Sequence, residues 1–71
     1  MTIVDLLMVS IDERDYKRRD VAAIYALAIA VEPPNSSRWA TVNMAIINRW
    51  SRYGLEWIKR EAWKQIEEPE R

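Results

Sequence analysis

The sequence contains no cysteine, no histidine and no phenylalanine, and only 1 glycine in 71 residues. Without cysteine there is no disulfide framework and no thiol nucleophile, and without histidine there is no imidazole general base. The usual zinc ligand sets are missing for the same reason. A single glycine also excludes a glycine-rich loop that cradles phosphate groups. We therefore expect no catalysis, no cofactor, no metal site and no small-molecule substrate.

An excess of charge is also missing, because 11 basic and 11 acidic residues cancel. The length allows one small domain over residues 1–71, and the 49% of apolar residues is typical of a folded chain. A chain of this size buries only about 60% of its unfolded surface. We therefore expect help from a second subunit, and a homodimer is the simplest form of it.

No run of apolar residues is long enough to span a bilayer. The longest runs from Val21 to Val31, whereas a membrane-spanning helix needs about 20 residues. The first residues, Met1 to Val9, are apolar but lack the basic segment and the cleavage site of a signal peptide. These features predict a soluble, cytoplasmic protein that does not bind membranes.

Helix start signals organise the first half of the chain. Thr2 and Asp5 have the spacing of a capping box and predict a short helix over residues 3–9. A strand is the alternative there, because isoleucine, valine and threonine are frequent in strands. The segment Ser10 to Glu13 repeats the capping signal and predicts a second helix over residues 11–31.

The second predicted helix is rich in alanine, which lets neighbouring helices approach closely. Its apolar residues recur at helical spacing along a broad stripe, so we expect it to be a buried helix at the centre of the fold. Pro33 and Pro34 end it, since proline lacks the amide proton and disfavours helix in the residue before it.

Two shifted apolar stripes predict two further helices, over residues 37–51 and 55–68. Possible N-caps of the first are Asn35, Ser36 and Ser37. Its stripe consists of Trp39, Val42, Ile46, Trp50 and Tyr53. The second stripe consists of Leu55, Ile58, Ala62 and Ile66.

The shift between the stripes, together with Gly54, indicates a break at residues 51–54, and Pro69 should end the last helix. One long bent helix over residues 37–67 is the alternative. The fold class predicted is an all-α bundle of three or four helices, without disulfides or metal.

The carboxylates and serines offer no catalytic constellation. Most carboxylates lie at predicted helix starts or next to a basic residue at helical spacing, as Glu56 does with Arg60 and Glu61 with Lys64. Helix caps and solvated ion pairs account for them. No serine lies in a nucleophile elbow, and no imidazole is present to activate one.

Charge is distributed unevenly along the chain. Residues 1–37 hold four basic and six acidic groups, whereas residues 38–64 hold six basic and two acidic groups. Tryptophan and tyrosine alternate with arginine in the basic part. Such a surface is able to contact phosphates or stack on bases. It also has a structural interpretation, in which the segment Arg49 to Tyr53 closes the corner between two helices by cation–π contacts.

Trp57 has no place on the apolar face of its own predicted helix. At 100° per residue it points about 150° from the centre of that face, so it should be exposed or pack against another element. Trp63 flanks the face at about 90°. If residues 37–67 formed one continuous helix, Trp57 would instead join the earlier stripe. The candidate partner-binding residues are Arg49, Arg52, Tyr53, Trp57, Lys59, Arg60, Trp63 and Lys64.

These observations favour a non-enzymatic protein-interaction module, such as a regulator, adaptor, inhibitor or assembly subunit. Aromatic anchors with basic residues around them are typical of binding hot spots. The alternative is a small dimeric DNA-binding regulator with a loose helix-turn-helix over residues 43–66. An alignment on Gly54 weakens that alternative, because Trp50 falls at a small position, Arg49 at an apolar one and Arg60 at a buried one.

Overall fold

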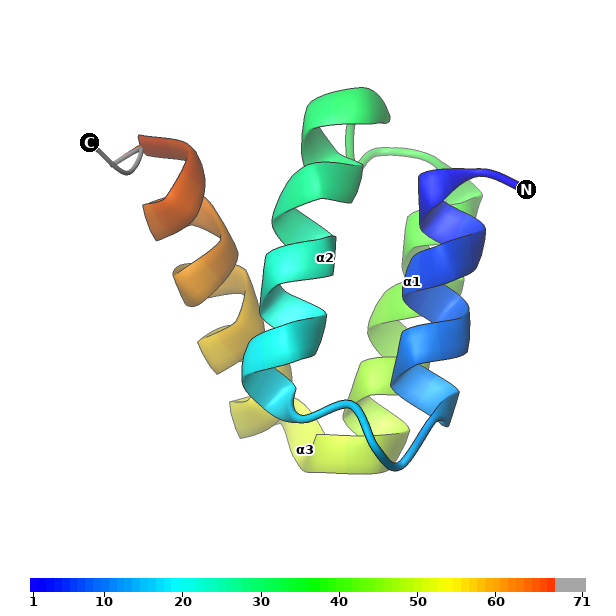
Figure 1. Ribbon diagram of the computed structural model, residues 1–71, viewed down its shortest axis with the longest axis vertical. Coiled ribbons are helices and arrows are strands. Elements are labelled where there is room, and N and C mark those ends of the chain that lie inside the picture. The colour runs from blue at the N-terminus through cyan, green and yellow to red at the C-terminus, as the bar shows by residue number, and fades with distance from the viewer. Residues whose placement is uncertain (68–71) are drawn as a thin grey trace.

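A computed structural model describes residues 1–67, which form three helices around one core (Figure 1). These are α1 (Ile3–Asp12), α2 (Arg18–Val31) and α3 (Ser37–Glu67). The described part of the chain contains no strand, so the all-α prediction and the choice of helix for the first element are confirmed. Helices α1 and α2 lie side by side. The first half of α3 lies behind α1, and its second half runs along the other side of α2 (Figure 1).

The predicted capping box begins α1. The amide of Asp5 donates to Thr2 Oγ1 at 3.2 Å, and the amide of Thr2 donates to Asp5 Oδ2 at 2.9 Å. The second bond holds the pKa of the Asp5 carboxyl below its usual range, and the nearby Arg38 guanidinium adds to that effect. Arg38 also reaches Glu32, at 3.4 Å, and so links the ends of all three helices.

The predicted boundary between the first two helices is wrong. Helix α1 extends to Asp12, and α2 begins at Arg18 rather than at residue 11. Ser10 is not an N-cap: it is fully buried within α1, where its hydroxyl donates to the carbonyl of Leu7 at 2.7 Å. The cap of α2 is instead the carboxylate of Asp20, which accepts from the amide of Lys17 at 2.9 Å. Because Ile11 is buried on the core face, α1 continues beyond Ser10, where the capping pattern predicted the start of a new helix.

Helix α2 ends at Val31, just before the two prolines, as predicted. One side of it is buried between the other helices, through Val21, Ala22, Tyr25 and Ala28. The opposite side faces solvent, with Leu27 61% and Val31 72% exposed. The expectation of a helix buried at the centre is therefore wrong for this outer face.

The break predicted over residues 51–54 is present, at Ser51. Ser51 has φ 74° and ψ 176°, whereas the residues on both sides continue the helix. A positive φ with such a ψ is a conformation found almost only in glycine. One prediction is thereby corrected, because the second half of α3 starts directly after Ser51 rather than at residue 55. Gly54 itself does not have a positive φ. The predicted end at residue 68 and the stop at Pro69 lie outside the described residues.

Gly54 serves the bend in a different way. A Cβ atom placed on it would overlap the Cβ of Trp50. The glycine therefore lets the turn before the bend approach the turn after it. Beyond the bend, Leu55, Ile58 and Ala62 are buried as predicted, but Ile66, predicted on the same face, is 38% exposed.

The core joins residues from all three helices. Trp39 is buried against Tyr25 in an edge-to-face arrangement, with ring centroids 5.0 Å apart. The Tyr25 hydroxyl donates to Asn43 Oδ1 at 3.0 Å. Burial raises the pKa of this hydroxyl to about 12, and the negative charge of Glu56 adds to the rise. The core cluster consists of Val4, Leu7, Ile11, Val21, Ala22, Tyr25, Ala26, Ala28, Trp39, Val42, Ile46, Leu55, Ile58 and Ala62.

Candidate interaction surface

Arg49, a predicted partner-binding residue, is used within the chain. Its guanidinium donates to the carbonyls of Ile11 at 2.9 Å, Glu13 at 3.0 Å and Tyr16 at 2.6 Å. Longer bonds of 3.4 Å reach the carbonyls of Ser10 and Arg14. The last carbonyls of a helix have no partner inside the helix, so Arg49 caps the end of α1 and holds the connection to α2. This arrangement agrees with the structural interpretation, in which the segment closes a corner.

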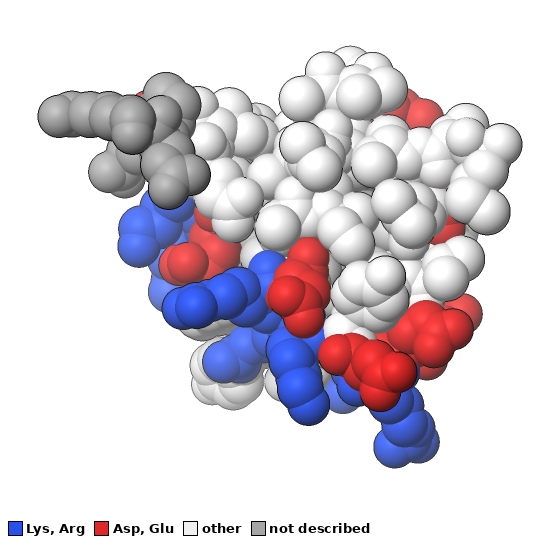
Figure 2. Space-filling model, viewed as in Figure 1, with Lys and Arg blue, Asp and Glu red and all other residues white. Residues whose placement is uncertain are grey.

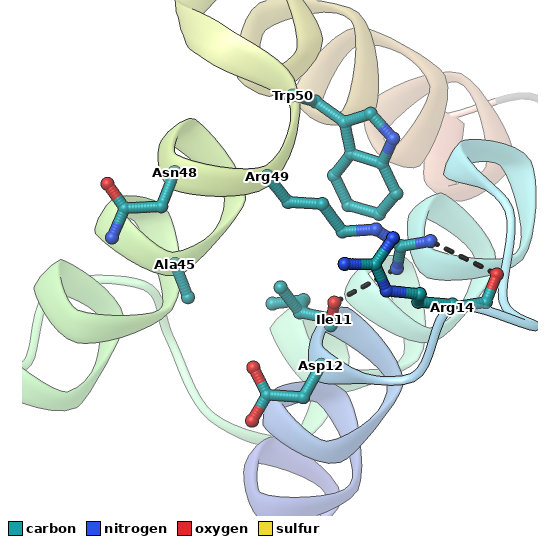
Figure 3. A pocket seen from close by; sticks show the side chains of 7 residues that line it. All are labelled: Ile11, Asp12, Arg14, Ala45, Asn48, Arg49 and Trp50. Carbon is teal, nitrogen blue, oxygen red and sulfur yellow. Dashed lines mark hydrogen bonds between the residues drawn. The ribbon is translucent and has the colours of Figure 1, made fainter.

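The corner also contains an open pocket of about 610 Å³ (Figure 3). Arg49 crosses it from α3 to the end of α1, with Arg14 beside it and the Trp50 ring above. The centre of the Arg49 guanidinium lies 4.0 Å from the centroid of that ring. Since carbonyls already occupy its donors, this cation is not free to bind an anion in the pocket. The lining residues are Ile11, Asp12, Arg14, Ala45, Asn48, Arg49 and Trp50.

A second group of candidates lies on the second half of α3, where α2 begins. The Arg18 guanidinium of α2 lies 4.3 Å from the centroid of the Trp57 ring. Trp57 is half-buried, because it packs against the edge of the core and has Arg18 over its face. Figure 2 shows basic side chains in this region, with acidic side chains between them, below the uncharged part of the surface.

We call this area the basic-aromatic surface. Its members are partly or fully exposed and come from the first turn of α2 and the second half of α3. Arg18 belongs to it through its contact with Trp57, and the exposed Arg19 follows in the first turn of α2, although the sequence did not point to either. The members are Arg18, Arg19, Arg52, Tyr53, Trp57, Lys59, Arg60, Trp63 and Lys64.

Its aromatic residues differ in accessibility. Tyr53 is 89% exposed and Trp63 is 42% exposed. Tyr53 belonged to the predicted apolar stripe of residues 37–51, but the bend at Ser51 turns it out of the core. Tyr53 and Trp63 are therefore the side chains with the most apolar area to offer a partner.

The charges of this surface are only weakly paired. Lys59 lies 4.0 Å from Glu56, and Lys64 lies 3.6 Å from Glu61. Exposed pairs of this kind contribute about 0.2–1 kcal/mol. Arg52 and Arg60 are exposed and form no ion pair within residues 1–67. The surface thus combines accessible aromatic rings with cations that are available to an acidic partner.

Neither a metal centre nor a membrane span is found among residues 1–67. Residues 1–67 contain no cluster of three or more possible metal ligands. Although α3 has 31 residues, no helix in the described chain combines the length and the apolar character needed to cross a bilayer.

Helix α2 contributes to two surfaces that the sequence did not indicate, the basic-aromatic surface and an exposed apolar face on its outer side. Arg18 and Arg19 precede the alanine-rich segment, and nothing local indicates that they meet residues about 40 positions later. A signal for the exposed outer face was present, since Ala23, Leu27 and Ala30 repeat at spacings of four and three on the side opposite Tyr25. A helix that is apolar on every side is usually buried, so the sequence pattern predicted a buried helix rather than one with an exposed apolar face.

Comparisons with protein-family models, with curated proteins and with solved structures returned no match for this chain. Its function therefore has to be inferred from its residues and their geometry.

Proposed function

We propose that the protein is a non-enzymatic interaction module that binds a protein partner through its basic-aromatic surface. Regulators, adaptors, inhibitors and assembly subunits act in this way. The observation that carries the proposal is the position of Tyr53 and Trp63, two exposed aromatic residues on a helical segment that also exposes Arg60 and Lys64.

The binding mode follows from these residue types. Tyrosine and tryptophan bury much apolar area with few rotatable bonds, so they are favoured as anchors at interfaces. Arginine and lysine at the rim raise the rate of association with an acidic partner and set its orientation. The contact between Trp57 and Arg18, both members of this surface, also holds the second half of α3 against α2.

Affinity capture with matched variants tests the proposal. Wild-type protein is used as bait in a lysate of the source organism, next to the double variant Tyr53→Ser with Trp63→Ser. Proteins retained by the wild type should be lost with the double variant. Trp57→Ala is a poorer choice, because Trp57 packs against the core and its loss also lowers stability.

Met44→Ser is the control, since Met44 is an apolar residue of the same helix that is 55% exposed and lies outside the basic-aromatic surface. It should retain the same proteins as the wild type. Circular dichroism checks that all variants keep their helical content. Equal capture by the wild type and the double variant would refute the proposal.

A DNA-binding regulator is the second candidate, and one observation favours it. Arg18 lies over Trp57, so α2 adds a cation to the segment of α3 that also exposes Arg60 and Lys64. Neutralisation of several phosphates makes binding fall steeply with salt. The acidic Glu56 and Glu61 on the same segment argue against this candidate.

Fluorescence anisotropy of a labelled duplex at two salt concentrations separates the two candidates. The DNA candidate requires binding that weakens steeply with salt and is abolished by Arg19→Glu with Arg60→Glu. No binding at micromolar protein in low salt removes it. The protein-interaction proposal predicts that second result.

A further inference from the structure

We infer that the outer face of α2 binds a second copy of this chain, with the two α2 helices antiparallel and a two-fold axis next to Leu27. The apolar residues of this surface lie outside the basic-aromatic surface, which shares with it only the basic start of α2, and the inference goes beyond the proposed function. The outer face consists of Ala23, Leu27, Ala30 and Val31.

The first argument is the apolar character of an exposed face. Residues 21–31 contain no charged side chain, yet Leu27 and Val31 are 61% and 72% exposed. Leu6 and Val9 on the neighbouring α1 are exposed as well. Figure 2 shows a broad uncharged area over these helices, with the charged residues below it and at its edges. Contiguous apolar areas of this kind mark interaction sites.

The second argument is that the face fits its own copy. In an antiparallel pair with the axis at Leu27, residue 31 of one copy lies opposite residue 23 of the other. Val31 then meets the smaller Ala23 of the partner on each side of the axis. A two-fold interface requires this kind of self-complementarity, and the alanines permit the close approach of two helices.

The third argument is charge at the two ends of α2. Three basic residues, Lys17, Arg18 and Arg19, lie at its start beside one acidic residue, Asp20, so this end is net basic. The partly negative carbonyl end lies at its finish with Glu32, which also pairs with Arg38 at 3.4 Å. An antiparallel pair brings the basic start of one helix toward the negative end of the other. A parallel pair would place like charges together.

The size of the face predicts a weak dimer. The 14 residues of α2 are about 21 Å long at 1.5 Å per residue. The apolar residues of this face are few, and together with Leu6 and Val9 of α1 they remove at most about 1,000 Å² from the two copies, near the lower end of specific interfaces. We therefore expect a weak dimer that forms only at high protein concentration.

Sedimentation equilibrium over a concentration series measures this dimer. The wild type should shift from monomer to dimer as its concentration rises, and Leu27→Lys should remain monomeric at every concentration. Met44→Lys is the control, because Met44 is exposed to a similar degree on α3 and should leave the dimer unchanged. A wild type that stays monomeric at millimolar concentration overturns the inference, as does a dimer that persists in Leu27→Lys.

Cysteine cross-linking tests the register without disturbing the face by a charge. The chain has no cysteine, so a single introduced cysteine is its only thiol. Leu27→Cys lies on the two-fold axis and should oxidise readily to a disulfide-linked dimer. Ala23→Cys lies about 12 Å from its own copy, so it should not cross-link with itself, but it should cross-link with Val31→Cys. Self-cross-linking of Ala23→Cys together with failure of Leu27→Cys would overturn the antiparallel arrangement.

Discussion

The Nη1 atom of Arg49 lies 2.9 Å from the carbonyl oxygen of Ile11 and so joins the middle of α3 to the end of α1. The same guanidinium accounts for five hydrogen bonds to main-chain carbonyls between Ser10 and Tyr16. These carbonyls would otherwise depend on water at a helix end.

Loss of Arg49 should therefore lower stability. Hydrogen bonds to a charged group contribute about 1.5–3 kcal/mol, and unpaired carbonyls at a partly buried site add to the cost. We expect Arg49→Met to lower the free energy of unfolding by about 2–3 kcal/mol, as measured by urea denaturation. Arg52→Met is the matched control and should change it by less than about 0.5 kcal/mol. Equal effects of the two variants would show that Arg49 does not hold the corner.

Ser51→Gly should stabilise the protein. The backbone of Ser51 is in a region that costs a residue with a Cβ atom about 1–3 kcal/mol, and the side chain is exposed. The greater freedom of glycine in the unfolded chain offsets part of this gain. We expect a net increase of about 1 kcal/mol in the free energy of unfolding, while Ser51→Ala stays near the wild type. A loss of stability typical of glycine inside a regular helix would contradict the bend.

Gly54→Ala should have the opposite effect. The new Cβ would overlap the Cβ of Trp50, and relieving this clash requires the bend to open. Overpacking of this kind costs about 1–3 kcal/mol, which thermal denaturation would show as a lower midpoint. The same change in a Trp50→Gly background removes the clashing atom and should cost much less. A similar cost in both backgrounds would mean that Gly54 is needed for another reason.

Tyr25 should make stability depend on alkaline pH. Its pKa is raised to about 12 in the folded chain, from the ordinary value of 10.0 for an exposed tyrosine. Between these values the unfolded state releases the proton while the folded state keeps it, so stability is full below pH 10 and falls as the pH rises toward 12.

Urea denaturation from about pH 9 to about pH 12 measures this loss for the wild type and for Tyr25→Phe. The variant lacks the hydroxyl, so the part of the decline due to Tyr25 should disappear and leave only the contribution of the remaining groups. Parallel declines in both proteins would show that the burial of the Tyr25 hydroxyl does not affect its ionisation.

The predictions that held depend on interactions between residues close in sequence. The capping box of Thr2 and Asp5 spans three residues, and the two prolines end α2 by local geometry. The shift of the apolar stripe predicted a break, and Ser51 provides it. The error at Ser10 arose because the local capping signal of Ser10 to Glu13 predicts a helix start there, whereas the burial of Ile11 in the core extends α1 to Asp12.

The candidate surface was only partly predictable. Tyr53 and Trp63 are exposed on the segment that the sequence indicated, but Arg49 is occupied by carbonyls of α1. Arg18 joins the surface only because α2 packs against the second half of α3. Contacts of this kind connect residues far apart in the chain, and a single sequence carries no direct signal of them.

By itself, the sequence of this protein determined the all-α class, the start of α1, the end of α2 and the presence of a bend in α3. These features follow from backbone geometry and from the periodicity of apolar residues, both of which act over a few positions. Tertiary structure alone decided that Ser51 carries the bend, that Arg49 caps α1 and that one face of the alanine-rich helix is open to solvent. The physical reason is that burial depends on which helices cover one another, and three helices of this length do not surround α2 on every side.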